Sequence, residues 1–108
     1  MEISKQKVMR TMDKLGYAES TVGTRYIRQA VEIAANMAHA MMTKDIYPEI
    51  ARMNGVTAYA AERAMRTATD QARRSPSWEF NWREIGGWND PTNAEVIFRL
   101  ARECIIED

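Results

Sequence analysis

Apolar residues recur three and four positions apart along most of the chain, which is the spacing of one face of an α-helix. The first such pattern covers residues 2–15 and ends at Gly16. A longer pattern begins at Thr24 and runs to about Met42, and its stripe is broad enough for the central helix of a bundle. The stripe consists of Tyr26, Ile27, Ala30, Val31, Ala34, Met37, Ala38 and Met41. No alternating apolar run bounded by turn residues is present, so no strands are expected.

Two helices joined by a tight turn are predicted between Tyr47 and Arg74. Asp45 is expected to cap the first of them, Pro48 is tolerated in its first turn, and Gly55 ends it. Thr57 is the expected N-cap of the second helix. A small residue, Ala51, lies four positions before Gly55, and an apolar residue follows the glycine. This spacing is typical of a helix-turn-helix corner, although an ordinary pair of helices with a solvated basic face would show it as well.

The second of these helices, about residues 58–73, has two contrasting faces. Its inner face is built mostly from alanine, which lets a neighbouring helix approach closely, and consists of Ala61, Ala64, Met65, Ala68 and Ala72. Its outer face is polar and rich in arginine, and consists of Tyr59, Glu62, Arg63, Arg66, Thr67, Asp70, Arg73 and Arg74.

Residues 75–91 change in character, because prolines and glycines interrupt any regular pattern. We expect an irregular segment here, with at most a short turn around Trp82–Ile85. It carries four large aromatic residues, Trp78, Phe80, Trp82 and Trp88. Two interpretations remain open: the aromatic rings fold back as a lid over the core, or they form an exposed contact surface for a partner or for the DNA backbone.

The last helix is predicted by a capping box from Thr92 to Glu95. Its apolar face consists of Val96, Ile97, Leu100, Ala101, Cys104 and Ile105. Any exposed part of this face would be a candidate dimer seam, with Val96, Ile97, Leu100 and Cys104 as its expected members.

Length and composition fit one all-α domain over residues 1–108, a compact bundle of about five to six helices. Hydrophobic residues make up 45% of the chain, but no apolar run approaches the length of a membrane span, and no signal peptide is evident. The single cysteine, Cys104, cannot form an internal disulfide. We therefore expect a cytoplasmic protein with no membrane partner.

The formal net charge is zero, yet the charges are unevenly distributed. Residues 57–74 hold four Lys or Arg against two Asp or Glu, whereas residues 75–108 hold three against seven. A basic surface opposite an acidic side would orient the protein on a polyanion, although the asymmetry is equally compatible with chance.

Motifs that support catalysis are missing from the sequence. There is no glycine-rich phosphate loop, no CxxC, no HExxH and no nucleophile elbow. His39 and Cys104 are the only residues of their types and lie far apart in the sequence. We therefore expect neither an enzyme nor a metal site, and no cofactor or small-molecule substrate.

Four motifs, spaced over roughly residues 3–106, resemble the C-terminal DNA-binding domain of stage 0 sporulation protein A, a response regulator. They are Gly23-x-x-Tyr26-x-x-x-x-Ala30, Thr43-Lys44-x-x-Tyr47-Pro48-x-Ile50-Ala51, Thr57-Ala58-x-x-x-Glu62-Arg63-Ala64-x-Arg66 and Pro91-Thr92-Asn93-x-Glu95. The resemblance implies a six-helix fold that binds double-stranded DNA, with the second helix of the motif in the major groove. It assigns base contacts to Glu62 and Arg63, which matches the affinity of arginine for guanine and of carboxylates for cytosine N4.

The chain also departs from the pattern of that family. Ala60 stands where the family usually has a base-reading arginine, Thr67 where a histidine is usual, and Tyr59 where a small polar residue is usual. The DNA sequence that the family reads is therefore not expected to carry over intact. The 108 residues also hold no phosphoreceiver domain, so we expect a stand-alone regulator.

We predict a sequence-specific transcription regulator of the sporulation-regulator type that binds double-stranded DNA. A homodimer and a pairing with a related regulator are both compatible with the sequence. The predicted DNA contacts are Lys44, Thr57, Ala58, Tyr59, Ala60, Glu62, Arg63, Arg66, Thr67, Arg73 and Arg74. This hypothesis requires Arg63 and Arg66 to be uncovered and free of internal ion pairs. The alternative is a protein-interaction module that pairs with or antagonises a full-length regulator, through the last helix or the Trp-rich segment, without binding DNA.

Overall fold

The structure is a computed structural model that describes residues 2–106. This range contains six α-helices and one π-helical turn, so the predicted all-α bundle of about five to six helices is confirmed. The elements are α1 (Lys5–Leu15), α2 (Val22–Asn36), η1 (Met42–Ile46), α3 (Tyr47–Asn54), α4 (Ala58–Arg73), α5 (Trp78–Glu84) and α6 (Asn93–Glu103). Within residues 2–106, strand-like pairing is limited to a single antiparallel bridge between Ile3 and Ile105.

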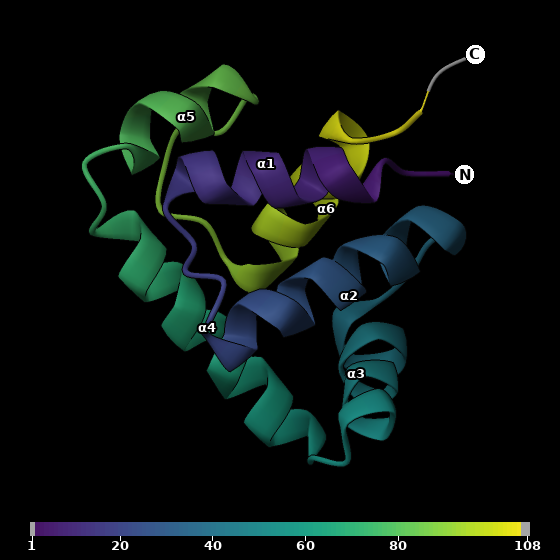
Figure 1. Ribbon diagram of the computed structural model, residues 1–108. Helices are drawn as coiled ribbons and strands as arrows, with labels where there is room; N and C mark the ends of the chain where they lie inside the picture. Colours follow the sequence, from purple (N-terminus) through teal and green to yellow (C-terminus); the bar gives the residue numbers. More distant parts are fainter. Residues whose placement is uncertain (1, 107–108) are drawn as a thin grey trace.

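Helix α2 runs through the middle of the bundle, as Figure 1 shows. Helices α3 and α4 meet in a V below it, and α1, α5 and α6 lie above. The side chains of Ile27, Ala30 and Val31 on α2 are fully enclosed by these neighbours. The prediction that this helix is central to the bundle is therefore confirmed.

Helix α1 begins at Lys5, three residues later than predicted, because Ser4 is its N-cap and accepts a hydrogen bond from Lys7 N. The residues before it bond to the end of the chain instead. Ser4 N donates to the Cys104 carbonyl and Ile106 N donates to the Glu2 carbonyl, at 2.9 and 3.0 Å. The two ends of the described chain are therefore held side by side (Figure 1).

Helix α2 begins at Val22 and ends at Asn36, so its predicted bounds of Thr24 and about Met42 were wrong at both ends. The side-chain amide of Asn36 donates to the Glu32 carbonyl, which competes with continued helix. His39 then takes a left-handed backbone conformation, with φ of 58°, and lies in the connection rather than in the helix. The methionines of this segment, Met37 and Met41, are exposed.

The turn η1 leads directly into α3. The prediction that Asp45 caps α3 was wrong. Its Oδ2 reaches back and accepts a hydrogen bond from Met41 N at 2.9 Å. The backbone N–H of Ile46 bonds to the Met41 carbonyl five residues earlier, which is π-helical spacing. Pro48 lies in the first turn of α3, as predicted.

The Trp-rich segment contains a regular helix, α5, where only a short turn was predicted. Trp78 and Trp82, one turn apart, are buried and stacked with ring centroids 5.4 Å apart. Phe80 and Trp88 are exposed. The lid interpretation is therefore confirmed for Trp78 and Trp82, whereas a contact role for the exposed Phe80 and Trp88 stays a prediction.

Helix α6 begins with the predicted capping box, in which Thr92 and Glu95 bond to each other's backbone N–H. Its expected dimer seam was wrong. Val96, Ile97, Leu100 and Cys104 have no exposed surface, because they face α2 and the rest of the core. Side chains that are fully enclosed within one chain cannot contact a second chain. No helix within residues 2–106 is both long and apolar enough to span a membrane.

Candidate nucleic-acid interface

The corner between α3 and α4 has the backbone geometry that the spacing of Ala51, Gly55 and Val56 predicted. Gly55 takes a left-handed conformation with φ of 66°, which glycine adopts without steric cost. The N–H groups of Gly55 and Val56 both bond to the Ala51 carbonyl, which closes the end of α3. Val56 then packs against the core. The corner therefore fixes the angle at which α4 leaves α3.

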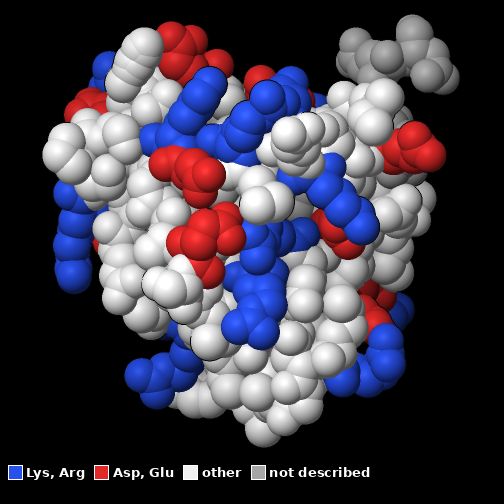
Figure 2. All heavy atoms as spheres, in the orientation of Figure 1, with Lys and Arg blue, Asp and Glu red and all other residues white. Residues whose placement is uncertain are grey.

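Thr57 caps α4, as predicted: its hydroxyl accepts a hydrogen bond from Ala60 N at 3.0 Å. Ala58, Tyr59 and Ala60 follow, and all three are exposed at the start of the helix. The first turn of α4 thus lies at the tip of the V formed by α3 and α4 (Figure 1). In Figure 2 this tip is largely uncharged, with lysine or arginine side chains on either side of it.

The predicted faces of α4 are present. The inner face packs on α2, and its buried residues are Ala61, Met65, Ala68, Thr69 and Ala72. Ala64 is only half-buried, although it lies at the crossing with α2, where Gly23 approaches its carbonyl. The outer face carries Arg63, Arg66 and Thr67 in exposed positions.

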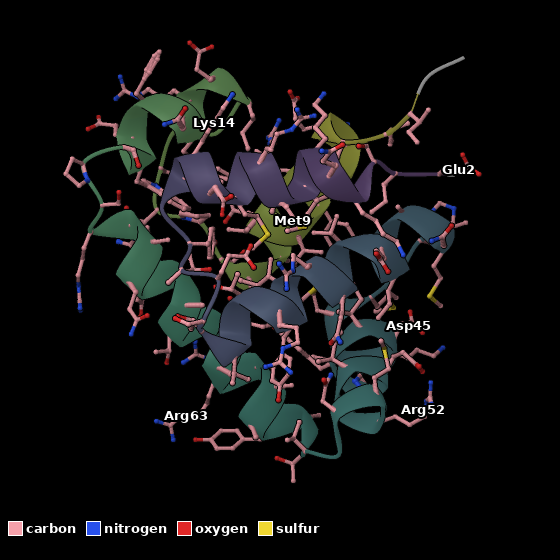
Figure 3. All side chains as sticks on the ribbon, in the orientation of Figure 1. Glu2, Met9, Lys14, Asp45, Arg52 and Arg63 are labelled. Atoms are coloured by element: carbon pink, nitrogen blue, oxygen red, sulfur yellow. The ribbon has the colours of Figure 1, made fainter. Side chains whose placement is uncertain are left out.

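Arg63 extends away from the bundle along the outer side of α4 (Figure 3). Within residues 2–106 it contacts Tyr59, one turn earlier. The guanidinium carbon lies 5.6 Å from the centroid of the tyrosine ring, and Nη1 donates to the phenol oxygen at 3.5 Å. Tyr59, which replaces a small residue of the family pattern, therefore supports the extended arginine, and no carboxylate of residues 2–106 pairs with it.

Arg66 differs from Arg63 because it forms an ion pair with Glu62, one turn earlier on the same helix. The expectation that both guanidinium groups are free of internal pairs was therefore wrong for Arg66. The arginine side chain is nevertheless 62% exposed. Exposed ion pairs of this kind contribute about 0.3–0.5 kcal/mol to stability, so a ligand can replace Glu62 as the partner of Arg66 at little cost in free energy.

Three further cations among the predicted DNA contacts, Lys44, Arg73 and Arg74, are in different environments. Arg73 bonds to Asp70 at 3.2 Å and to Asp90 at 2.8 Å, so its charge is largely compensated. Lys44 in η1 and Arg74 at the end of α4 are exposed and form no ion pair within residues 2–106.

Two asparagines position the helix-turn-helix, and neither role was predicted. Asn93 donates to the Tyr47 hydroxyl at 3.1 Å and to the Glu62 carbonyl at 3.3 Å, which joins α6 to both α3 and α4. Asn54 donates to the Gln29 side chain at 2.7 Å and so joins α3 to α2. The Pro-Thr-Asn motif could have indicated a role for Asn93. Its threonine alone explains the helix cap, so the asparagine was left without an assigned function.

The described residues offer little for metal binding or catalysis. Within residues 2–106 no three His, Cys, Asp or Glu side chains gather as a metal site would require. Cys104 is buried, and burial raises the pKa of its thiol above the usual range. A thiol held protonated in this way is a poor nucleophile.

The fold and this surface define an all-helical helix-turn-helix protein whose second motif helix has an exposed face with cationic side chains. Residues 8–104 match the family model described as Sporulation initiation factor Spo0A C terminal. The chain therefore belongs to this family, which is the DNA-binding effector domain of a sporulation transcription regulator and is not enzymatic.

Proposed function

We propose that this chain binds double-stranded DNA with the outer face of α4 in the major groove and thereby regulates transcription in the cytoplasm. The observation that supports this most directly is the exposed, outward-pointing Arg63 on the second helix of a capped helix-turn-helix. Membership of a DNA-binding family gives independent support.

In this proposal the residues of α4 have separate roles. Arg63 donates to a guanine edge, and Glu62 accepts from a cytosine or releases Arg66 to a base or phosphate. The exposed first turn at Ala58 and Tyr59 presents backbone N–H groups to a phosphate, as helix N-termini do. Ala60 and Thr67 lie against the groove without charged contacts, so the sequence preference is expected to differ from that of relatives with arginine and histidine there.

The test is a selection of bound duplexes from a random library, followed by fluorescence anisotropy on the selected duplex and on a scrambled one. Arg63→Ala is expected to cost about 1–3 kcal/mol on the selected duplex and much less on the scrambled one. Arg66→Ala is expected to weaken binding to both, by a smaller amount.

A matched control is available on α5. Arg83 is 64% exposed and pairs with Glu79 one turn earlier, as Arg66 pairs with Glu62. Arg83→Ala removes the same charge and the same kind of pair, so it is expected to leave DNA affinity unchanged. If Arg83→Ala weakens binding as much as Arg66→Ala does, only the total charge matters. If no duplex is enriched, the proposal is wrong.

A further inference from the structure

Trp88 is the most exposed large hydrophobic residue of the described chain, with 80% of its surface accessible. The loop that carries it is nevertheless held from two sides. Gly87 N donates to the Trp82 carbonyl at 2.8 Å, and the Trp82 indole donates to the Asn89 carbonyl at 3.1 Å. Asp90 bonds to Arg73 on α4 at 2.8 Å. The indole ring is therefore presented to solvent by an anchored loop.

The loop cannot easily rearrange to bury this ring. A Cβ on Gly87 would lie 2.0 Å from the Trp82 ring, so the backbone of the loop rests directly on a buried side chain. Trp82 in turn stacks on Trp78 in the core. The position of Trp88 is thus fixed by packing beneath it, which is the preorganisation that a binding residue needs.

A cleft of about 360 Å³ lies between Trp88 and α6. Its apolar wall includes Phe98, which is 39% exposed. The charged residues at its edge are Glu95, Arg99 and Arg102. None of the residues that line this cleft is among the predicted DNA contacts, although Trp88 also borders a second cleft that includes Arg73 and Arg74.

The charges at the cleft are unevenly compensated. Arg99 and Arg102 form no ion pair within residues 2–106, and the Arg99 guanidinium lies over Gly86. The carboxylate of Glu95, by contrast, accepts from the backbone N and the hydroxyl of Thr92 in the capping box. The cleft therefore offers two unpaired cations beside exposed aromatic rings.

We propose that this cleft binds an acidic segment of a partner protein, with a bulky apolar side chain against Trp88 and Phe98 and carboxylates on Arg99 and Arg102. Tryptophan and arginine are the residues that most often dominate the energy of a protein interface, and arginine binds carboxylates in a bidentate manner. DNA is a poorer fit. The second cleft beside Trp88 carries three carboxylates and three arginines, so it shows no excess of positive charge that would favour phosphates.

The probe is a fluorescein-labelled 14-residue peptide of alternating Glu and Leu with one central Phe, and its counterpart has Lys in place of every Glu. Anisotropy is expected to show saturable binding of the acidic peptide only. Trp88→Ala should weaken it by about tenfold or more, as for an interface hot spot, and Arg102→Glu by several-fold. Phe80→Ala is the matched control, because Phe80 is 58% exposed but lies outside the cleft, and it should have no effect.

Four outcomes would overturn the proposal. The first is no saturable binding to the folded wild-type chain, and the second is equal binding of the lysine peptide. The third is a dimer, detected by light scattering, that Trp88→Ala dissociates, since a second copy would then occupy the cleft. The fourth is a loss of duplex affinity in Trp88→Ala as large as in Arg63→Ala, which would assign the residue to the DNA surface. Circular dichroism checks that each variant is folded. If the Trp88→Ala protein does not fold, the Arg102→Glu protein still tests the proposal.

Discussion

Tyr17 shows how a single polar group can depend on the packing of two elements. Its hydroxyl lies 2.7 Å from the Thr69 hydroxyl on the buried face of α4, and its ring meets Trp78 edge-on at 6.0 Å. Burial raises the pKa of this phenol above its ordinary value of 10.0, and the hydrogen bond with Thr69 lowers it by a smaller amount. The hydroxyl therefore stays neutral in the fold at a pH where the unfolded chain would ionise.

We expect Tyr17→Phe to change both the stability of the protein and its pH dependence. Because the folded pKa is raised, the stabilisation from Tyr17 is present below about pH 10 and is lost as the pH rises above it, by about 1.4 kcal/mol per pH unit. Tyr17→Phe should remove this alkaline loss. It should also cost about 1–3 kcal/mol at pH 7, because the Thr69 hydroxyl is left buried without its partner.

Urea unfolding at several pH values between 7 and 11 measures this difference. Tyr59→Phe is the control, since Tyr59 is exposed, and its curve should follow that of the wild type. Parallel pH profiles for Tyr17→Phe and wild type would show that Tyr17 ionises equally in the folded and unfolded chains.

Side-chain positions on α4 could be predicted from the sequence, whereas their partners could be predicted only in part. The helical period alone placed Arg63, Arg66 and Thr67 on the outer side. The Glu62–Arg66 ion pair could also be predicted, because the two residues are four apart on one helix face. The ion pair of Arg73 with Asp90 could not be predicted, since it depends on how the loop that carries Asp90, seventeen residues later, packs against α4.

At the scale of elements, the orientation of α4 depends on its close crossing with α2. A Cβ on Gly23 would lie 1.9 Å from the Ala64 carbonyl oxygen, so the two backbones are nearly in contact. Gly55, at the helix-turn-helix corner, has nothing within 4 Å of a Cβ but has a positive φ of 66°. The two glycines are therefore required for different reasons, one for space and the other for conformation.

We expect Gly23→Ala to destabilise the fold by about 1–3 kcal/mol or more, because α2 and α4 must separate. Gly55→Ala should cost about 1–2 kcal/mol through backbone strain alone. Thermal unfolding measures both costs. DNA affinity of the folded protein separates the mechanisms: Gly23→Ala displaces α4 and should weaken binding, whereas Gly55→Ala should keep the α2–α4 packing. A Gly23→Ala protein with wild-type stability would show that the crossing is looser than described.

Elements were predictable where local signals agreed, and the errors came from segments where they conflicted. Gly16, Gly55, Thr57 and Thr92 are strong boundary signals, and each acts as predicted. The apolar stripe of α2 continues in the sequence through Met37, because methionine fits a helix, yet the chain leaves the helix at Asn36. Helix α5 was missed because its seven residues are flanked by prolines and glycines, although its two buried tryptophans are four apart.

At the scale of the whole molecule, a net charge of zero must be reconciled with binding to a polyanion. The placement of ion pairs provides an explanation. Figure 2 shows acidic and basic side chains interspersed over much of one face, where they partly compensate each other. Lys44, Arg63 and Arg74 form no ion pair within residues 2–106, whereas Arg73 is bound between Asp70 and Asp90. A few unpaired cations, rather than the total charge, would then determine the affinity for phosphates.

This view predicts how the affinity of the protein for DNA varies with salt. Each phosphate contact contributes about −0.9 to the slope of log K against log salt concentration. Arg74→Ala should therefore make the slope shallower by about one, and Arg73→Ala should change it less, because Arg73 is already paired. Asp90→Asn removes one partner of Arg73 and should make the slope steeper and binding tighter.

Anisotropy titrations between 50 and 200 mM salt, the range over which phosphate contacts change affinity strongly, measure these slopes. Asp13→Asn is the matched control for Asp90→Asn, because it makes the same charge change at an exposed position of α1. If both aspartate variants tighten binding equally, the effect comes from net charge, and Arg73 does not contact DNA. If only Asp90→Asn does, the ion pair between Arg73 on α4 and Asp90 in the Trp88 loop limits the affinity of the protein for DNA.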